Sequence, residues 1–347
     1  MAIDRVLSNE SMSEQEEHFN SALRPKTLDE VVGQNSVKDK LSIAIQAAKQ
    51  RNEPLEHILF YGPPGLGKTT LANVIAAEMG SAIRVSSGPA LVKQGDVMGL
   101  LTNVGSGDIL FIDEIHRLST SVEEFIYPAM EDFKVDFTVD SGLHAKTINF
   151  PLKRFTLIGA TTRAGLLSAP LRGRFGMMYH LEFYSPDDLA LILERSARLL
   201  NLPSADSALE MIASRSRGTP RIANRLLKRV RDYAQVKGSG QLNKDIVDKA
   251  LKMEQIDELG LDELDRAVLR SIATVYDGGP AGIEAIAATL GEERDTLEDV
   301  VEPYMLQIGF LRRTKKGREI TEAACKHIGV KYKGSKTASS DEQEDMF

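Results

Sequence analysis

Short apolar runs alternate with amphipathic stretches through the first half of the chain. The runs Ile58–Tyr61, Ile109–Ile112 and Phe155–Ala160 have the length and the content of buried strands. The stretch Thr70–Glu78, which follows the first of these runs after a glycine-rich loop, has the apolar spacing of an amphipathic helix. Such an alternation of strands and helices is typical of a parallel sheet with helices on both faces. We therefore expect an α/β domain over residues 21–183.

An insertion interrupts this alternation at residues 133–150. Apolar and polar positions alternate in its first half, and Ser141-Gly142 then predicts a turn into a returning strand. The apolar positions are Phe133, Val135, Phe137 and Val139. This pattern predicts a β-hairpin inserted after a helix, and an edge pair of the main sheet is the alternative.

After Tyr184 the pattern becomes wholly helical. Ser185 and Pro186 form a favourable helix start, with serine as the cap and proline in the first turn. This helical pattern continues to about Glu254. Residues 184–256 are therefore expected to form a small helical domain.

The last patterned region, residues 257–333, combines helices with short strands. Its expected helices are residues 265–276, 283–290 and 294–306, and its expected strands are residues 309–314 and 318–321. Three helices followed by a hairpin resemble a winged helix, a variant of the helix-turn-helix. The two ends, residues 1–20 and 334–347, are polar and without apolar period, so we expect a mobile N-terminal segment and a disordered tail.

Composition adds limits to this picture. A chain of 347 residues should form two or three domains, because single cores seldom exceed roughly 250 to 300 residues. No apolar run approaches the roughly 18 residues of a membrane span, and the N-terminus lacks a signal-peptide core, so we expect a cytoplasmic protein without a membrane partner. The single cysteine, Cys325, excludes an internal disulfide and is interpreted as a small helical core residue rather than a reactive thiol.

The net charge of −7 neither supports nor excludes DNA as a partner. Acidic residues are concentrated near both ends, at residues 10–17 and 341–345. Affinity for phosphates depends on local cations rather than on the total charge.

The loop Gly62–Thr69 matches GxxxxGK[ST] in full. It lies between an expected strand and an expected helix, which is the context that a phosphate-binding loop requires. Backbone N–H groups of such a loop surround phosphates at a helix N-terminus, where the helix dipole also favours negative charge. Lys68 is then expected to reach the β and γ phosphates, and the Thr69 hydroxyl to ligate magnesium.

Two carboxylates, Asp113 and Glu114, end the second expected strand. Beside a phosphate loop, Asp113 is expected to hold magnesium, directly or through water, and Glu114 to orient the attacking water. Helix capping is the alternative for both residues.

The order of these features resembles the AAA+ ATPases. A third strand ends in Thr161-Thr162-Arg163, and an arginine pair, Arg172 and Arg174, precedes Phe175-Gly176. More closely, the chain resembles the RuvB family, bacterial Holliday-junction branch-migration motors, from about residue 23 to about residue 329. The stretches that carry this resemblance are residues 62–73, 110–118, 127–133, 156–165, 218–227 and 290–304.

The resemblance implies roles for further residues. One of Thr161 and Thr162 would be the sensor of the γ-phosphate and the attacking water. Arg174 would be the arginine finger, contributed to the nucleotide of a neighbouring subunit, and Arg172 is its rival. The implied catalytic residues are Lys68, Asp113, Glu114, Thr161, Thr162 and Arg174.

In the helical domain, Arg221 of Gly218-Thr219-Pro220-Arg221 would be the lid sensor, and Arg217 lies close enough to be confused with it. Leu23 and Arg24 belong to the segment that would wall the adenine. The residues that the resemblance implies for ATP binding are Leu23, Arg24, Gly62, Pro63, Pro64, Gly65, Leu66, Gly67, Lys68, Thr69, Thr70, Glu131, Asp132, Phe133, Arg174, Tyr184 and Arg221.

The expected wing, residues 312–318, contains five cations and no aromatic residue. This composition suits phosphate contacts without sequence readout, although a solvated basic turn is the alternative. By family correspondence, Arg294, Arg313 and Arg318 would contact DNA.

The resemblance implies an ATP- and Mg²⁺-dependent motor that acts on duplex arms of a four-way DNA junction as a hexameric ring. RuvA would dock on the hairpin through an exposed apolar face formed by Phe133, Val135, Phe137 and Val139, and RuvC would be a further partner. A protein remodeller and a clamp-loader-like module are the alternatives. A remodeller is expected to carry an aromatic pore loop, and Ser81–Gly107 contains no aromatic residue.

Overall fold

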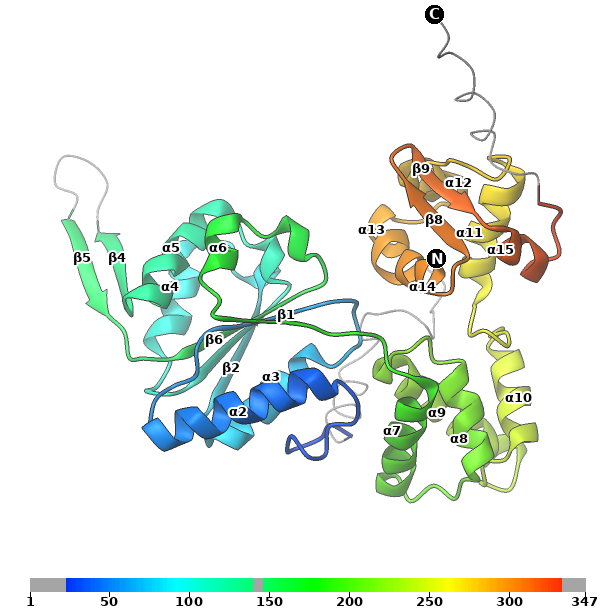
Figure 1. The fold of residues 1–347 in the computed structure, drawn as a ribbon, viewed down its shortest axis with the longest axis horizontal. Coiled ribbons are helices and arrows are strands. Elements are labelled where there is room, and N and C mark those ends of the chain that lie inside the picture. Colours follow the sequence, from blue (N-terminus) through cyan, green and yellow to red (C-terminus); the bar gives the residue numbers. More distant parts are fainter. Residues whose placement is uncertain (1–22, 140–145, 333–347) are drawn as a thin grey trace, which may run out of the picture. The chain divides into compact units, whose positions relative to one another are not determined.

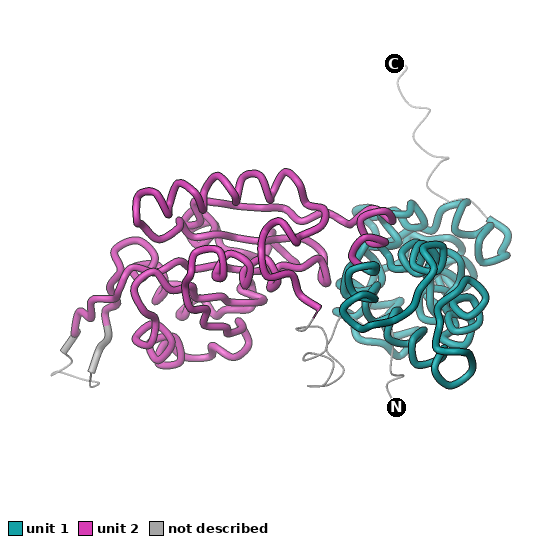
Figure 2. Tube along the Cα trace, turned by 90° about the horizontal axis from the view of Figure 1, so that it is seen from below, with its two compact units in different colours: residues 1–12, 193–347 teal, residues 13–192 magenta. Residues whose placement is uncertain are grey.

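The computed structural model describes residues 23–139 and 146–332. The expectations for residues 1–20, for the turn at Ser141-Gly142 and for residues 334–347 lie outside the described residues. Within the described part, the chain forms two compact units, residues 23–192 and residues 193–332 (Figure 2).

The first unit contains a parallel five-stranded sheet with the order β2-β3-β6-β1-β7 (Figure 1). The strands are β1 (Ile58–Tyr61), β2 (Ile83–Ser87), β3 (Ile109–Asp113), β6 (Thr156–Thr161) and β7 (Met177–His180). All neighbouring strands are parallel. The expected α/β class is confirmed, and the three strands expected in this domain, β1, β3 and β6, lie within one residue of their predicted bounds.

Helices cover both faces of this sheet, as Figure 1 shows. The helices are α2 (Asn35–Arg51) and α3 (Lys68–Met79) on one face, and α4 (Gln94–Thr102), α5 (Thr120–Glu131) and the short α6 (Ala169–Gly173) on the other. Successive strand side chains point to opposite faces. Leu110 and Ile112 therefore pack with α4 and α5, in a core that also includes Val97 and Phe125.

The strand order brings three chemically important strand ends together. Strand β6 lies between β1 and β3, and Tyr61 at the end of β1 pairs with Thr161 at the end of β6. Because the carboxyl ends of parallel strands share one edge, the loop after β1, Asp113 and Thr161 lie at the same edge of the sheet.

The insertion is a hairpin of β4 (Lys134–Val139) and β5 (Lys146–Pro151). Val135 pairs with Phe150, and Phe137 pairs with Ile148. Among the described residues, these two strands form a sheet of their own, separate from the five-stranded sheet. The hairpin prediction is therefore confirmed, and the edge-pair alternative is wrong.

The second unit begins within a helical domain that consists of α7 (Pro186–Leu199), α8 (Asp206–Ser214), α9 (Pro220–Lys237) and α10 (Lys244–Met253). Helix α7 starts as predicted, since the Asp188 N–H donates to Ser185 Oγ over 3.1 Å. One face of α9 is fully buried, including Ala223, Leu226 and Val230. A stripe of this kind holds the helices together by apolar burial.

A winged helix follows. It contains α11 (Glu263–Thr274), α12 (Ile283–Leu290), α13 (Arg294–Thr296), α14 (Glu302–Gln307), the strands β8 (Leu311–Thr314) and β9 (Gly317–Ile320), and α15 (Glu322–His327). Its core includes Val268, Ile286, Met305 and Cys325, which confirms the interpretation of the cysteine. Burial also raises the pKa of the Cys325 thiol, so the thiolate is disfavoured.

The expected helix 294–306 departs from regular geometry. A π-helical turn, Leu297–Val301, separates α13 from α14. Pro303 has no N–H with which to continue the ladder of hydrogen bonds, which explains an irregular turn just before it. In the described part of the chain, every helix is too short or too polar to cross a bilayer.

Candidate ATPase and DNA-binding sites

The phosphate loop depends on glycine at two of its positions. Gly62 has a φ of 138° and Gly67 a φ of 95°, in the region that side-chain-bearing residues avoid. A Cβ on Gly62 would also lie 2.5 Å from the Leu181 carbonyl oxygen. Gly67 caps α3 without a side-chain hydrogen bond, so the first-turn N–H groups of α3 point toward the loop.

Lys68 lies inside this loop. Lys68 is only 8% exposed, and its Nζ donates to the carbonyl oxygens of Gly62 (2.8 Å) and Pro63 (2.9 Å). A buried ammonium group next to a helix N-terminus attracts phosphate oxygens strongly. Thr69 follows it in the first turn of α3.

The two predicted acids lie at the adjacent strand end. Asp113 Oδ1 accepts the Glu114 N–H over 2.9 Å, and the Glu114 carboxylate forms an ion pair with Arg117 at 3.1 Å. Glu114 has a φ of 47° although it is not glycine. Such strained backbone is concentrated at functional sites, and here it turns the chain sharply after the strand. The Thr69 hydroxyl and the Asp113 carboxylate are oxygen ligands of the kind that Mg²⁺ prefers, so these residues fit that ion.

Strand β6 ends beside His116, a residue that the sequence analysis missed. Thr161 is fully buried, its Oγ1 lies 3.0 Å from His116 Nδ1, and it accepts the Arg163 N–H over 3.0 Å. Thr162 is half-buried at the same edge. The choice between the two threonines stays a prediction. His116 follows Glu114 by two residues, and that proximity to the acids is the signal that could have identified it.

Tyr184 and Leu23 are both buried, and Tyr184 contacts the phosphate loop. The Tyr184 hydroxyl donates to the Leu66 carbonyl oxygen over 3.3 Å, and a Cβ on Gly33 would lie 2.9 Å from the Tyr184 ring. Burial raises the pKa of Tyr184 to about 12, so its hydroxyl stays neutral. Tyr184 therefore contacts both the segment around Gly33 and the phosphate loop.

Arg174 contacts residues of its own subunit. Its guanidinium lies 4.1 Å from the centre of the Tyr127 ring, forms an ion pair with Glu131 at 3.3 Å and donates to the Pro170 carbonyl oxygen over 2.8 Å. Two residues implied in ATP binding, Arg174 and Glu131, are thus paired with each other. Tyr127 is a neighbour that the sequence analysis missed. Arg172, the rival, is exposed.

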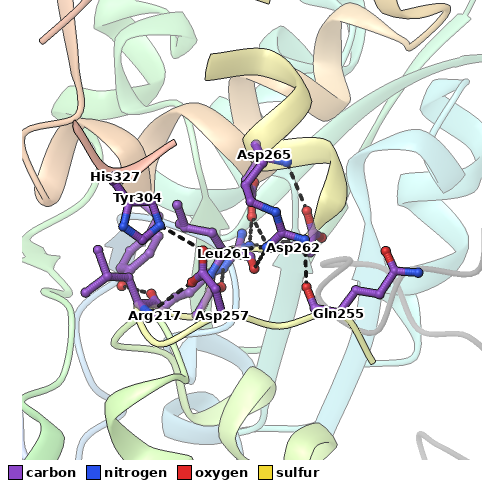
Figure 3. Close-up of polar contacts among 11 residues, drawn as sticks. Arg217, Gln255, Asp257, Leu261, Asp262, Asp265, Tyr304 and His327 are labelled. Atoms are coloured by element: carbon purple, nitrogen blue, oxygen red, sulfur yellow. Dashed lines mark hydrogen bonds and ion pairs between the residues drawn. The ribbon is translucent and has the colours of Figure 1, made fainter. Parts of the chain in front are cut away.

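The structure separates Arg221 from Arg217. Arg221 is exposed in the first turn of α9. Arg217 is 2% exposed and is bonded to Asp265 and to the Gly260 carbonyl oxygen, both in the winged helix (Figure 3). Arg217 is therefore held in the junction between the two domains of the second unit.

Acidic residues accompany all three arginines predicted to contact DNA. Arg294 pairs with Glu284 (3.1 Å) and Glu298 (3.3 Å), while its side chain stays half exposed. The Arg313 side chain is 63% exposed and lies 3.9 Å from Glu302.

Arg318 is different, because its side chain is only 10% exposed. It donates to both carboxylate oxygens of Glu302 (3.0 and 2.9 Å) and to Glu298 at 3.3 Å. In this conformation the guanidinium is already bound by two carboxylates. Its contact with DNA stays a prediction.

The hairpin requires a correction to its expected apolar face. Val135 is fully buried in the core of the first unit, and Phe133 packs near His57 and Phe155. The base of β4 therefore stabilises the fold. The side chains of Phe137 and Val139 lie outside the described residues. The exposed apolar residues described on the hairpin are Ile148 and Phe150 of β5, with exposed fractions of 51% and 39%. Sequence analysis missed both.

A phosphate loop, an Asp-Glu strand end and a third polar strand end on one sheet edge, followed by a helical lid, define an AAA+ ATPase, and a winged helix is joined to it. Three family profiles match the chain: "Holliday junction DNA helicase RuvB P-loop domain" at residues 23–181, "RuvB AAA lid domain" at residues 184–257, and "RuvB C-terminal winged helix domain" at residues 258–329. The chain belongs to the RuvB family.

Individual relatives agree with this assignment. The "Holliday junction branch migration complex subunit RuvB" of Desulfosudis oleivorans is 58% identical over 313 residues, which are 90% of this chain and 91% of that protein. The protein of the same name from Ligilactobacillus salivarius is 54% identical, over 95% of this chain and 98% of its own. A solved structure of Thermotoga maritima RuvB, described as a Holliday junction branch migration motor, has a TM-score of 0.82 at 53% identity, over 89% of this chain and 99% of its own.

Proposed function

We propose that this chain is the ATP-driven motor of Holliday-junction branch migration in DNA recombination and repair. One observation carries the proposal: a P-loop ATPase domain and a winged helix occur in one chain, which relatives named as branch migration subunits match over nine tenths of its length or more. The residues of the sheet edge explain ATP hydrolysis, and those of the wing explain attachment to DNA.

The positions of the side chains support the following ATPase chemistry. The N–H groups of the loop and Lys68 hold the phosphates, and Glu114 orients a water for attack on the γ-phosphate. Thr69 and Asp113 would hold Mg²⁺, which neutralises phosphate charge when bound. Thr161 or Thr162 orients the same water from the neighbouring strand.

We also propose that Arg174 acts on the nucleotide of an adjacent subunit, in a hexameric ring. An arginine in trans stabilises charge that develops on the transferred phosphoryl group, so hydrolysis depends on assembly. In the described subunit Arg174 is paired with Glu131, and that pair would exchange for contacts with the neighbour's nucleotide.

For partners, we propose duplex arms of a four-way junction, RuvA and RuvC, in the cytoplasm. The hairpin supports docking of RuvA through Ile148 and Phe150, because these two exposed apolar side chains are two residues apart on β5 and therefore lie on one face of it, where a partner can cover both. The substitution Phe150→Asp should weaken capture of RuvA at least about 30-fold, the effect of losing an interface hot spot. Val236→Asp, which charges an exposed apolar residue of the lid, is the matched control.

Strand displacement from a synthetic four-way junction tests the main proposal. With RuvA and ATP, we expect labelled arms to separate, and we expect no separation without ATP. ATP turnover that ignores DNA, with no movement of the junction, would leave a clamp-loader-like module or a protein remodeller as the better interpretation.

A further inference from the structure

The loop between α8 and α9 carries an arginine in an unusual conformation. Arg217 has a φ of 52°, a left-handed backbone that costs a side-chain-bearing residue roughly 1–2 kcal/mol. The next residue is Gly218, also at positive φ, and the helix that holds Arg221 begins at Pro220. Strained backbone of this kind persists only where the surrounding contacts hold it.

The neighbouring winged helix supplies contacts that hold the Arg217 side chain (Figure 3). Its Nε donates to the Gly260 carbonyl oxygen over 2.8 Å, and its Nη2 donates to the Asp265 carboxylate. Asp262 lies 4.0 Å away, and the guanidinium carbon lies 5.4 Å from the centre of the Tyr304 ring. A lid side chain that is only 2% exposed is thus bound by another domain.

The two carboxylates beside Arg217 form the capping box of α11. The Asp262 N–H donates to Asp265 Oδ2 over 2.9 Å, and the Asp265 N–H donates to Asp262 Oδ1 over 3.0 Å. Asp265 is fully buried, and a buried carboxylate needs a paired cation. Arg217 therefore binds the first turn of the helix whose apolar face, including Leu269 and Ile272, forms the winged-helix core.

The connector between α10 and α11 is fixed as well. Arg266 donates to the carbonyl oxygens of Leu261 (2.7 Å) and Gln255 (2.9 Å), and the Tyr304 hydroxyl donates to the Leu259 carbonyl oxygen (2.7 Å). Asp257 pairs with His327 of α15 at 2.9 Å. The connector is therefore bonded to helices of the winged helix on several sides and does not behave as a flexible linker.

Glycine at position 260 makes this contact possible. Gly260 has a φ of 75°, and any Cβ there would overlap the Arg215 carbonyl oxygen of the lid. The backbones of the two domains thus approach each other without an intervening side chain, directly beside the bond from Arg217.

We propose that Arg217 is a positioning residue that couples the lid to the winged helix, so that nucleotide-dependent movement of the lid displaces the DNA-bound wing. Arg217 lies four residues before Arg221, in the loop that enters α9, so a shift of that helix on ATP hydrolysis moves the first turn of α11 with it. This inference rests on the proposed motor function for the source of the movement, but the rigid connection itself does not.

The first experiment measures the connection directly. Spin labels at Val236→Cys in α9 and at Val275→Cys at the end of α11, both exposed positions, report the distance from the lid to the winged helix in the full chain with Cys325→Ala. The expected distance distribution is narrow with ADP, with a non-hydrolysable ATP analogue and without nucleotide. In Arg217→Met combined with Asp265→Asn, which leaves no buried unpaired carboxylate at position 265, it should broaden. An unchanged narrow distribution in that variant overturns the proposal.

The second experiment measures coupling in the complete motor with RuvA and a four-way junction. In the double variant Arg217→Met, Asp265→Asn, we expect ATP turnover to persist while junction movement per ATP falls about tenfold, which is within the range of coupling mutations. Arg215→Met is the matched control, because Arg215 is a buried arginine of the same loop that pairs within the lid, with Asp248 at 3.4 Å. Normal movement per ATP in the double variant, or equal loss of turnover and movement, contradicts the proposal.

The two experiments separate failure of the motor from failure of the connection. If the unaltered chain moves no junction, the proposed function fails, while the label distances still judge the connection. If the double variant does not fold in a thermal unfolding assay, Arg217→Lys replaces it: lysine keeps a charge beside Asp265 but cannot bond Gly260 and Asp265 with one planar group, so the same broadening is expected.

Discussion

The sheet edge and the wing are both candidate phosphate-binding regions, but they present charge in different ways. At the sheet edge, backbone geometry positions the functional groups: glycines at positive φ open the loop, and strand ends deliver Asp113 and Thr161. In the wing, the predicted phosphate contacts are long side chains, and their acidic neighbours leave Arg313 exposed but bury Arg318. A backbone-built site can be read from a motif, whereas a site of side-chain charges depends on partners that a motif does not contain.

The largest expected effect concerns the sheet edge. Arg174→Ala should lower ATP turnover of the assembled protein about 10³-fold, because the arginine in trans stabilises the transition state. Adding subunits with Lys68→Ala, which retain Arg174, should restore part of the turnover. Arg172→Ala should lower ATP turnover much less. If Arg172→Ala lowered turnover more than Arg174→Ala, Arg172 would be the arginine finger.

The next prediction separates structure from DNA contact in the wing. Arg318→Ala should destabilise the winged helix by about 3–5 kcal/mol, because it removes the buried partner of the Glu302 carboxylate and leaves only the exposed Arg313 at 3.9 Å. Chemical unfolding of the full chain measures this loss. A variant that is as stable as the unaltered protein but binds junction DNA poorly would instead assign Arg318 to phosphate contact.

A third prediction tests whether backbone geometry determines the ATP site. Gly62→Ala should destabilise the first unit by roughly 1–3 kcal/mol and reduce ATP binding, because its Cβ would overlap the Leu181 carbonyl oxygen. Gly99→Ala, within α4 and with open space around it, should instead stabilise by about 0.5–1 kcal/mol. Thermal unfolding and ATP titration of both variants make the comparison.

The smallest expected effect belongs to the exposed wing. Arg313→Ala should weaken DNA binding and make the slope of log K against log salt shallower by about 0.9 for each phosphate that this side chain neutralises, multiplied by the number of engaged subunits. Folding should be unaffected, since the side chain is 63% exposed. A salt slope equal to that of the unaltered protein would indicate a solvated turn.

Much of the fold could be predicted because local signals coincide with it. The bounds of β1 match the expected apolar run, and the Ser185 cap and helix α12 lie where the pattern places them. The irregular turn at Leu297–Val301 was missed, although Pro303 was visible, because an apolar period does not distinguish a π-helical turn from a regular one.

The motif residues of the candidate sites could be predicted from the sequence, but the residues that contact and position them could not. Tyr127 contacts Arg174 from 47 positions away, and Glu302 of helix α14 contacts Arg318 of strand β9. Contacts of this kind do not occur at a fixed sequence spacing, because tertiary packing brings the residues together. The buried Val135 shows the same limit: its alternating pattern is correct for a strand, but the pattern does not say which end of the strand lies in the core.

The division of the hairpin between a buried base and an exposed return strand also limits how this protein can be re-engineered. Val135 belongs to the core that folds the ATPase, whereas Ile148 and Phe150 face solvent on β5. If RuvA docks on this strand as proposed, partner choice can be altered by exchanging residues 148–150 between relatives while the ATPase core stays intact. An exchange that begins at residue 134 would also replace Val135, a residue of the ATPase core. The new side chain would then have to pack against a core that evolved with another sequence.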